Sequence, residues 1–298
     1  MFFGTSDFAV PALRAFAASL HCVLVVTQPD RPAGRGHKLR ATPVKLAAQA
    51  LGIATIEPER LRDAQAALAA LDADLFGVAS YGKIVPQALL DVPRLGALNV
   101  HPSLLPLYRG ATPLQAQLRD GVVTGGVTII AMDAGMDTGD VVVREERAIP
   151  SDETYGALHA RFAELGGTLL ARACALALAG TLERKPQRAF GTEDAAAATL
   201  TRPLRKDDAI LEWSWPARRV VDHVRSLSPQ PGARATLDGE PERVKILLAR
   251  LAGPTDDPTV LAVRCGDGVS VVVERLVPPN RAPLSGRAYR ASHASHAS

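Results

Sequence analysis

Short apolar runs alternate with helix-forming segments through the first 180 residues of the chain. The runs are continuous and bounded by turn residues, which is typical of strands buried on both faces of a sheet. Repetition of strand, helix and strand predicts a mostly parallel, doubly wound α/β sheet. We place strands at 21–28, 73–80, 96–100, 126–132 and 140–146, and helices at 42–52 and 59–71.

The first residues fit this pattern poorly. Residues 1–3 form an apolar stub that passes through a Gly turn into a helix-forming segment. Because a central strand usually has about five residues, either the first strand is short or the start codon lies upstream. The sequence leaves both possibilities open.

The second part of the chain has a different character. A long helix over 152–180 precedes a connector that is rich in charge and proline. Beyond one helix at 216–227, short strands alternate with hairpin turns such as 265–269, which predicts a small, barrel-like β domain. The predicted divisions are an α/β domain over 1–184, a linker over 185–205, the β domain over 206–290 and a disordered tail over 291–298.

Composition agrees with two domains, since the chain has 298 residues and is 47% hydrophobic. The net charge is +3, and residues from 201 onward carry 15 Lys and Arg against 11 Asp and Glu. This modestly basic part suits an anionic partner such as nucleic acid, although an ordinary solvated surface is equally compatible.

The three cysteines, Cys22, Cys174 and Cys265, lie far apart in the sequence. A sparse, odd set predicts reduced thiols in a cytoplasmic protein and argues against a disulfide framework or a zinc site. No apolar run reaches membrane-spanning length, and the first residues lack the pattern of a signal peptide. We therefore expect no membrane partner.

Two polar residues follow an apolar strand at the position where α/β sheets bind ligands. Asn99 and His101 stand at the carboxyl end of the strand at 96–100, and ligands of such sheets lie beyond that edge. Asp137 follows the next strand in a loop. An amide donor, an imidazole and a carboxylate that orients it suit acyl-type transfer, in which the donors stabilise an oxyanion and the carboxylate relays protons.

Other interpretations of these residues are open. Asn99 and His101 are also common turn residues that hydrogen-bond the backbone, and Asp137 can cap a turn. Asp133, Asp137 and Asp140 stand close together but lack the longer ligand pattern of a calcium loop, so we predict no metal site. No G-x-S-x-G motif is present and no cysteine lies near the set, which argues against a covalent acyl-enzyme.

The sequence around these residues resembles the folate-dependent formyltransferases. Residues 99–115, NVHPSLLPLYRGATPLQ, carry that family's Asn, its His two residues on, and SLLP. Residues 126–142, GVTIIAMDAGMDTGDVV, carry its Asp in a D-x-G-x-D-T-G loop. The likeness extends to 26–45, 79–96 and 206–213, and over most of the chain it is to the group that formylates methionyl-tRNA.

The resemblance implies a Rossmann-like domain followed by a domain like an oligonucleotide-binding barrel. It implies that the chain transfers the formyl group of 10-formyltetrahydrofolate to the α-amine of methionyl initiator tRNA. We further expect a monomer that uses no metal. Asn99 and His101 would hydrogen-bond the oxyanion. Asp137 would hold the imidazole and help to move the amine proton to the departing folate nitrogen.

The resemblance also assigns a folate-binding segment, formed by Ser103, Leu104, Leu105 and Pro106, with residues 81–86 as another wall. Backbone groups of the segment suit the edge of a pterin ring, and its leucines supply apolar contact. The alternative is a structural loop whose path is fixed by proline.

A basic loop supplies the cations that a tRNA partner requires. Residues 30–45 contain five Lys and Arg against one acid, and Gly34 and Gly36 flank Arg35, so we expect a flexible loop that orders on binding. By resemblance, Arg35 matches the family's loop arginine that approaches the acceptor stem; a solvated loop is the alternative. We assign Arg35, Lys38, Arg40, Arg205 and Lys206 to tRNA binding, with Arg218, Arg219 and Arg225 as further candidates.

Two other functions stay open. A formyltransferase acting on a small amine, such as glycinamide ribonucleotide or an amino sugar nucleotide, would share the three site residues but has no use for the basic loop and the basic β domain. A catalytically idle tRNA-binding relative would not need the complete set of Asn99, His101 and Asp137.

Overall fold

The computed structural model of the protein describes residues 1–33, 38–237 and 242–294. The chain forms two compact units whose segments alternate along the sequence. The predicted domain boundaries after residues 184, 205 and 290 stay a prediction. The first unit comprises Met1–Gly110, Gly125–Arg147 and His159–Leu200, and the second comprises Ala111–Thr124, Ala148–Leu158 and Thr201–Ser298.

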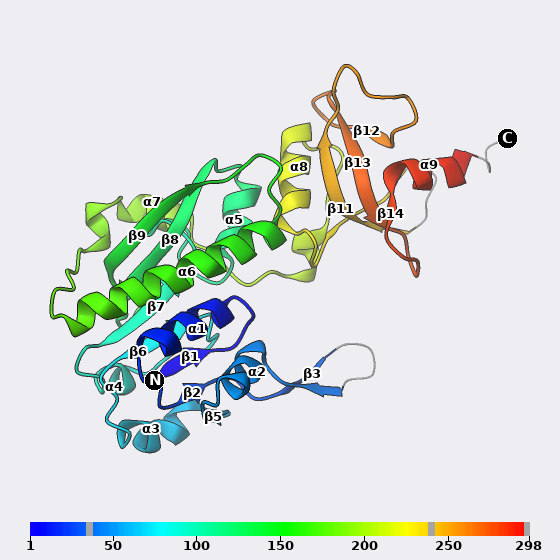
Figure 1. The fold of residues 1–298 in the computed structure, drawn as a ribbon. Helices are drawn as coiled ribbons and strands as arrows, with labels where there is room; N and C mark the ends of the chain where they lie inside the picture. The colour runs from blue at the N-terminus through cyan, green and yellow to red at the C-terminus, as the bar shows by residue number, and fades with distance from the viewer. Residues whose placement is uncertain (34–37, 238–241, 295–298) are drawn as a thin grey trace. The chain divides into compact units, whose positions relative to one another are not determined.

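A seven-stranded sheet forms the core of the first unit (Figure 1). In spatial order its strands are β5 (Thr55–Ile56), β2 (Val25–Val26), β1 (Phe2–Gly4), β6 (Phe76–Ala79), β7 (Ala97–His101), β8 (Thr124–Ala131) and β9 (Asp140–Ala148). The strands from β5 to β7 run parallel, and β8 is antiparallel to β7. The predicted mostly parallel α/β sheet is therefore confirmed.

β1 is a short strand at the centre of this sheet, where it pairs with both β2 and β6. Phe2 and Phe3 are fully buried, and they point to opposite faces because side chains alternate along a strand. The Phe2 ring lies 5.8 Å from that of Phe16 in α1 (Ala9–Ser19), and the Phe3 ring lies 5.1 Å from that of Phe76. Two aromatic side chains thus anchor a strand of only three residues.

Helices cover both faces of the sheet. A Cβ added at Gly77 would lie 2.7 Å from the Phe16 ring of α1, and one at Gly166 of α6 (Tyr155–Leu178) would lie 2.5 Å from Val100. α1 and α6 therefore press closely on the face that carries Gly77 and Val100. The opposite face packs against α3 (Leu61–Ala69) and α4 (Gln87–Leu90), whose Leu61, Leu68 and Leu89 share a core with Phe3 and Val78.

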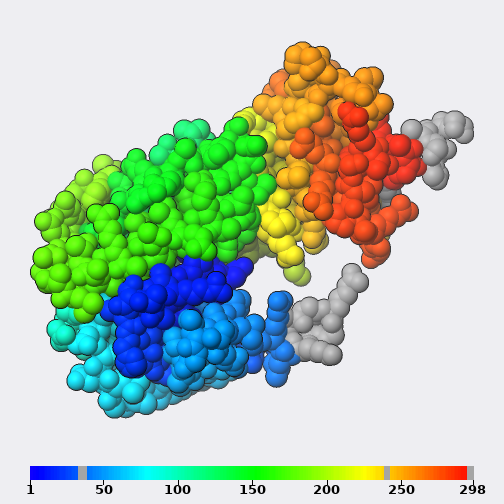
Figure 2. Space-filling model, in the orientation of Figure 1, coloured from blue at the N-terminus to red at the C-terminus, as the bar shows by residue number. Residues whose placement is uncertain are grey.

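Two short strands, which together form a hairpin, flank the basic loop. β3 (Arg31–Ala33) and β4 (Lys38–Arg40) pair in antiparallel fashion, and the hairpin projects from the body of the first unit (Figures 1 and 2). The loop that was predicted to be flexible is thus flanked by two short paired strands. The predicted Arg35 lies outside the described residues.

The second unit contains an antiparallel sheet, which confirms the predicted C-terminal β domain and gives it a half-barrel form. Its strands are β10 (Ala233–Ala235), β11 (Val244–Leu251), β13 (Ser270–Val277) and β12 (Ala262–Arg264), with β14 (Leu284–Ser285) beside β13. The hairpin at 265–269 joins β12 to β13 as predicted. Residues 238–241, between β10 and β11, lie outside the described residues.

The α-helices α5 (Pro113–Arg119), α8 (Ala217–Ser226) and α9 (Gly286–Ala294) lie in this unit. On α8, Val220, Val221 and Val224 are buried in the core of the unit, and Trp213 and Trp215 pack against it. The two tryptophans thus have the packing role that their position in a small β domain suggests.

Two segments predicted to be irregular are partly helical. The connector holds η1 (Gln187–Ala189) and α7 (Glu193–Ala198). α9 continues to Ala294, so it covers the first residues of the tail predicted over 291–298, which stays a prediction. The helix persists there because Tyr289 is buried in the core and the His293 ring stacks on it, with 4.0 Å between ring centroids.

The cysteines are free and buried, as expected for reduced thiols. Burial raises the pKa of the Cys174 thiol to about 12, which leaves it unreactive at neutral pH. In the described part of the chain, no helix combines the length and the apolar character that crossing a bilayer requires.

Candidate active site

β7 places two of the predicted site residues on one face of the sheet. Asn99 lies between Val78 of β6 and Ile130 of β8, and His101 lies beside Thr128 at the carboxyl end of the strand. Residues two apart in a strand share a face, so both side chains point away from the face that α6 covers. Asn99 is half-buried, and its amide makes no hydrogen bond within the described residues.

The imidazole of His101 is buried and held from both sides. Its Nε2 lies 2.9 Å from the carbonyl oxygen of Tyr108. Because a carbonyl only accepts hydrogen bonds, Nε2 carries a proton in this arrangement. Its Nδ1 lies 3.6 Å from Oδ1 of Asp137, so the two predicted partners meet, at a distance slightly longer than a hydrogen bond.

Asp137 occupies a demanding backbone position. Its φ is +56°, in the left-handed region where a non-glycine residue costs on the order of 1 kcal/mol or more. Its carboxylate Oδ2 accepts a hydrogen bond from the Gly110 amide at 2.9 Å, and its carbonyl accepts one from the Gln187 side chain at 2.7 Å. Contacts from two separate segments thus fix both the backbone and the carboxylate of Asp137.

Asp133 has a structural role in the same loop. Its Oδ1 accepts hydrogen bonds from the Gly135 amide at 3.0 Å and the Thr138 hydroxyl at 2.7 Å. Among the described residues there is no cluster of three His, Cys, Asp or Glu side chains that fits a metal ion. Asp133 therefore shapes the loop that presents Asp137.

The predicted folate segment is largely internal. Ser103 and Leu105 are fully buried, Pro106 is buried, and Leu104 is half-buried. The Thr128 hydroxyl donates to the Ser103 carbonyl at 2.7 Å and accepts from the Leu105 amide at 3.2 Å. Those two backbone groups are thus used to hold the loop on β8. The folate-binding role of the segment stays a prediction, with Leu104 as its most exposed member.

Known proteins match this chain over most of its length. Residues 1–174 match the formyl transferase family, and residues 203–294 match the formyl transferase C-terminal domain. A methionyl-tRNA formyltransferase from Anaeromyxobacter dehalogenans is 44% identical over 92% of this chain and 90% of its own length. The chain belongs to the formyl transferase family. A second relative in this family, the methionyl-tRNA formyltransferase of Pseudomonas fluorescens, is 44% identical over 91% of this chain and 84% of its own.

Solved structures show the same fold. An N-formyltransferase from Helicobacter canadensis, in complex with folinic acid and dTDP-3-aminofucose, matches with a TM-score of 0.68 and 16% identity over 91% of this chain and 97% of its own. A sugar N-formyltransferase from Shewanella matches with a TM-score of 0.59 and 20% identity over 83% and 96%. At such low identity the likeness establishes the formyl transferase fold alone.

The hairpin provides part of the predicted cationic surface. Arg40 is exposed at the end of β4, and Lys38 begins that strand. Lys45, counted with the basic loop, is different, because its ammonium contacts Asp30 at 2.9 Å and Glu57 at 2.8 Å. These contacts raise the pKa of Lys45, the Glu57 hydrogen bond most strongly. Lys45 therefore ties down the base of the hairpin.

In the second unit, Arg205 and Lys206 are exposed at η2 (Lys206–Ala209), where a phosphate can reach them. Arg225 was a further candidate for phosphate contact, and this expectation is wrong. Its side chain is only 4% exposed and pairs with Asp222 at 2.6 Å. Arg218 also pairs with Asp222, at 2.7 Å.

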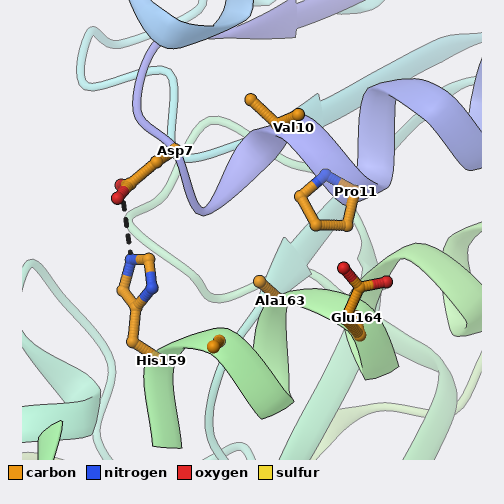
Figure 3. Close-up of a pocket in the computed structure, with 7 residues that line it drawn as sticks. Asp7, Val10, Pro11, His159, Ala163 and Glu164 are labelled. Carbon is orange, nitrogen blue, oxygen red and sulfur yellow. Dashed lines mark ion pairs between the residues drawn. The ribbon is translucent and has the colours of Figure 1, made fainter. Parts of the chain in front are cut away.

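A separate pocket of about 350 Å³ lies between α1 and α6 (Figure 3). Nε2 of His159 faces Oδ1 of Asp7 across it at 3.5 Å. The lining residues are Asp7, Val10, Pro11, His159, Ala160, Ala163 and Glu164. No predicted site residue lines this pocket.

Sequence reasoning missed two partners of the site. The Tyr108 carbonyl holds His101, and a backbone contact of this kind has no signature in residue type. Gln187 lies in the segment predicted to be a linker, 50 positions after Asp137. Gln187 stands among exposed charged residues such as Lys185 and Arg188, and no motif in the sequence marks it.

Proposed function

We propose that this protein transfers the formyl group of 10-formyltetrahydrofolate to the α-amine of methionyl initiator tRNA, giving formylmethionyl-tRNA for translation initiation. One observation carries the proposal. The carboxylate of Asp137 meets the imidazole of His101 beside Asn99, in a chain that is 44% identical to methionyl-tRNA formyltransferases over nine-tenths of its length.

Asn99 supplies the oxyanion donor. Attack of the α-amine on the formyl carbon forms a C–N bond and places negative charge on the formyl oxygen. The amide of Asn99 is half-buried and has no partner within the described residues, so it is available to donate to that oxygen. A donor already in place costs no reorganisation as the charge develops.

His101 and Asp137 move the proton. Nε2 of His101 donates to Tyr108, so Nδ1 is the ring atom that exchanges a proton. The attacking amine gives its proton to the pair formed by Nδ1 and the Asp137 carboxylate, and the carboxylate stabilises the resulting imidazolium. In that form, Nδ1–H is a second donor for the oxyanion. The proton then passes to the departing folate nitrogen as its bond to the formyl carbon breaks.

The two substrates use different parts of the chain. The half-exposed Leu104 and the loop around it suit the apolar face of a pterin, and we place the folate along residues 103–106. The exposed cations Arg40, Arg205 and Lys206, together with Arg35 and Lys38, suit the phosphates of tRNA. We further propose that the protein acts as a monomer in the cytoplasm, where initiator tRNA is charged and used.

A formyltransferase acting on a small amine remains the second candidate, because the solved relatives that share the fold include sugar N-formyltransferases. The basic hairpin and the C-terminal unit favour the tRNA substrate, since a nucleotide sugar has no use for an extended cationic surface. An idle tRNA-binding relative is disfavoured by the presence of Asn99, His101 and Asp137 together.

The deciding experiment offers 10-formyltetrahydrofolate with one of three acceptors: charged initiator tRNA, free methionine or a dTDP-amino sugar. We expect rapid formylation of the charged tRNA and negligible formylation of the other two. Preferential formylation of the amino sugar would establish the small-amine enzyme. Binding of tRNA without transfer to any acceptor would establish the idle binder.

A further inference from the structure

A buried glutamine outside the predicted site connects two of its loops. Gln187 is only 4% exposed. Its Nε2 donates to the carbonyl oxygens of Asp137 at 2.7 Å and Gly139 at 2.9 Å. Its Oε1 accepts from Nε of Arg109 at 3.0 Å and from Nη2 of Arg109 at 2.8 Å. Both ends of the amide are therefore satisfied, each by a different loop of the site.

Each of these contacts bears on Asp137. The bond to the Asp137 carbonyl holds a residue whose φ of +56° is unfavourable by itself. The bond to Gly139 fixes the backbone two residues further on. On the other side, Arg109 directly precedes Gly110, whose amide donates to the Asp137 carboxylate. Gln187 thus restrains both the backbone that carries the carboxylate and the segment that orients it.

The chain delivers Gln187 to this position by pairing with β9. Lys185 and Val141 exchange two backbone hydrogen bonds, at 2.8 and 2.9 Å, immediately before η1 begins at Gln187. After η1, Phe190 packs on the buried cluster of Leu105, Ile130 and Val141. The segment is therefore anchored on both sides of Gln187, which is what a fixed hydrogen-bond donor needs.

We propose that Gln187 is a positioning residue for formyl transfer, which holds Asp137 at the distance from His101 that proton movement requires. The inference rests on the proposed function and adds to it, because Gln187 need not touch either substrate. A displacement of about 1 Å at a reacting group can cost on the order of a hundred-fold in rate. Residues 185–205, which were predicted to be a linker, would thereby help to hold the Asp137 loop in place.

The test compares two variants in single-turnover formyl transfer to charged initiator tRNA. Gln187→Ala removes all four hydrogen bonds. Gln187→Glu keeps the acceptor for Arg109 but presents an oxygen, in place of the NH₂ donor, to the carbonyls of Asp137 and Gly139. We expect both to lower the rate of transfer by about ten- to a hundred-fold, with KM for folate and tRNA changed by less than about twofold. Normal transfer by Gln187→Glu would overturn the proposal.

A double-variant comparison separates positioning from a general loss of folding. In the Asp137→Ala background, Gln187→Ala should lower the residual rate by less than about twofold, because residues that act as a unit are not additive. A full, multiplicative loss would show that Gln187 does not act through Asp137. The matched control is Glu193→Gln, which neutralises an exposed carboxylate that pairs with Arg109 and should leave the rate unchanged.

Two further readouts keep the outcomes distinct. Wild-type protein that transfers no formyl group to charged tRNA would refute the proposed function, whereas active wild type with an unimpaired Gln187→Ala would refute only the role of Gln187. A crystal structure of Gln187→Ala tests that role without activity. We expect the Asp137 loop to shift, and an unmoved Asp137, still bonded to Gly110, would contradict the proposal.

Discussion

At the scale of single residues, several segments of the chain hold the groups of the candidate site in place. β7 carries both Asn99 and His101. Their place at the end of a strand was predictable from the sequence, and α/β sheets bind their ligands beyond the carboxyl ends of strands. The orientation of the His101 ring was not readable, since it depends on the Tyr108 carbonyl. Neither was the left-handed backbone of Asp137, which a non-glycine residue adopts only where the surroundings impose it.

The role of Asn99 gives the first prediction. Asn99→Asp keeps the size of the side chain but replaces the NH₂ donor with a carboxylate oxygen, which repels a developing oxyanion. We expect kcat for formyl transfer to fall by about a hundred- to a thousand-fold, with little change in thermal stability because the amide makes no hydrogen bond within the described residues. Steady-state kinetics and a thermal melt measure both quantities, and near-normal kcat would remove Asn99 from the mechanism.

His223 gives a prediction on pH. It is buried beside Trp215 in the second unit, and burial, with smaller contributions from Arg119 and Arg219, lowers its pKa to about 4. The unfolded chain binds this proton below the usual pKa of about 6.5. Between pH 6.5 and pH 4 the unfolded state therefore binds more protons than the folded state. The free energy of unfolding that is present above pH 6.5 falls by roughly 3 kcal/mol as the pH is lowered towards 4.

Urea unfolding at pH 7 and pH 4.5 measures this loss, and the fluorescence of the two tryptophans reports the second unit, which contains them both. His223→Leu should lose clearly less stability than the wild type between the two pH values. Equal losses in the two proteins would mean that His223 is not the titrating group.

At the scale of elements, the basic hairpin is where prediction from sequence was incomplete. Charge and glycine content suggested a flexible loop, but its flanks pair as β3 and β4. Lys45 was counted among the cations of the loop because its carboxylate partners are distant in the sequence. Asp30 lies 15 positions before it and Glu57 lies 12 positions after it. Charge runs therefore do not distinguish the exposed cations of the hairpin from Lys45, which is neutralised within the fold.

The exposed hairpin cation gives the next prediction. Arg40→Ala should weaken tRNA binding, and the slope of log affinity against log salt concentration should become shallower by about 1. The value of kcat at saturating tRNA should not change. Filter binding across a salt series provides the measurement, with Arg62→Ala on α3, an exposed cation elsewhere on the first unit, as the matched control. Identical behaviour of the two variants would contradict the assignment of the hairpin.

At the scale of the whole molecule, the two sheets followed from hydrophobic patterning, because alternating segments leave few ways to bury them. The alternation of the two units along the chain is not visible in such patterns. Residues Ala111–Thr124 and Ala148–Leu158 belong to the second unit, where α5 packs against α8. A contact between helices about a hundred residues apart depends on side-chain fit, which local sequence patterns do not predict.

This arrangement predicts the behaviour of a truncated chain. A fragment that ends at residue 200 lacks α8 and exposes apolar side chains of α5, each of which costs roughly 2 kcal/mol when fully exposed. We expect the fragment to aggregate or to melt well below the intact chain, as measured by circular dichroism and light scattering. A soluble, monomeric fragment with the thermal stability of the intact protein would contradict this account.

The central claim is that the imidazole of His101, paired with Asp137, moves the proton during formyl transfer to charged initiator tRNA. The most direct measurement is the single-turnover rate of that transfer by wild type and His101→Ala, with both substrates saturating. The account predicts rapid transfer by the wild type and a rate at least about a hundred-fold lower for the variant. Equal rates in the two proteins would contradict it.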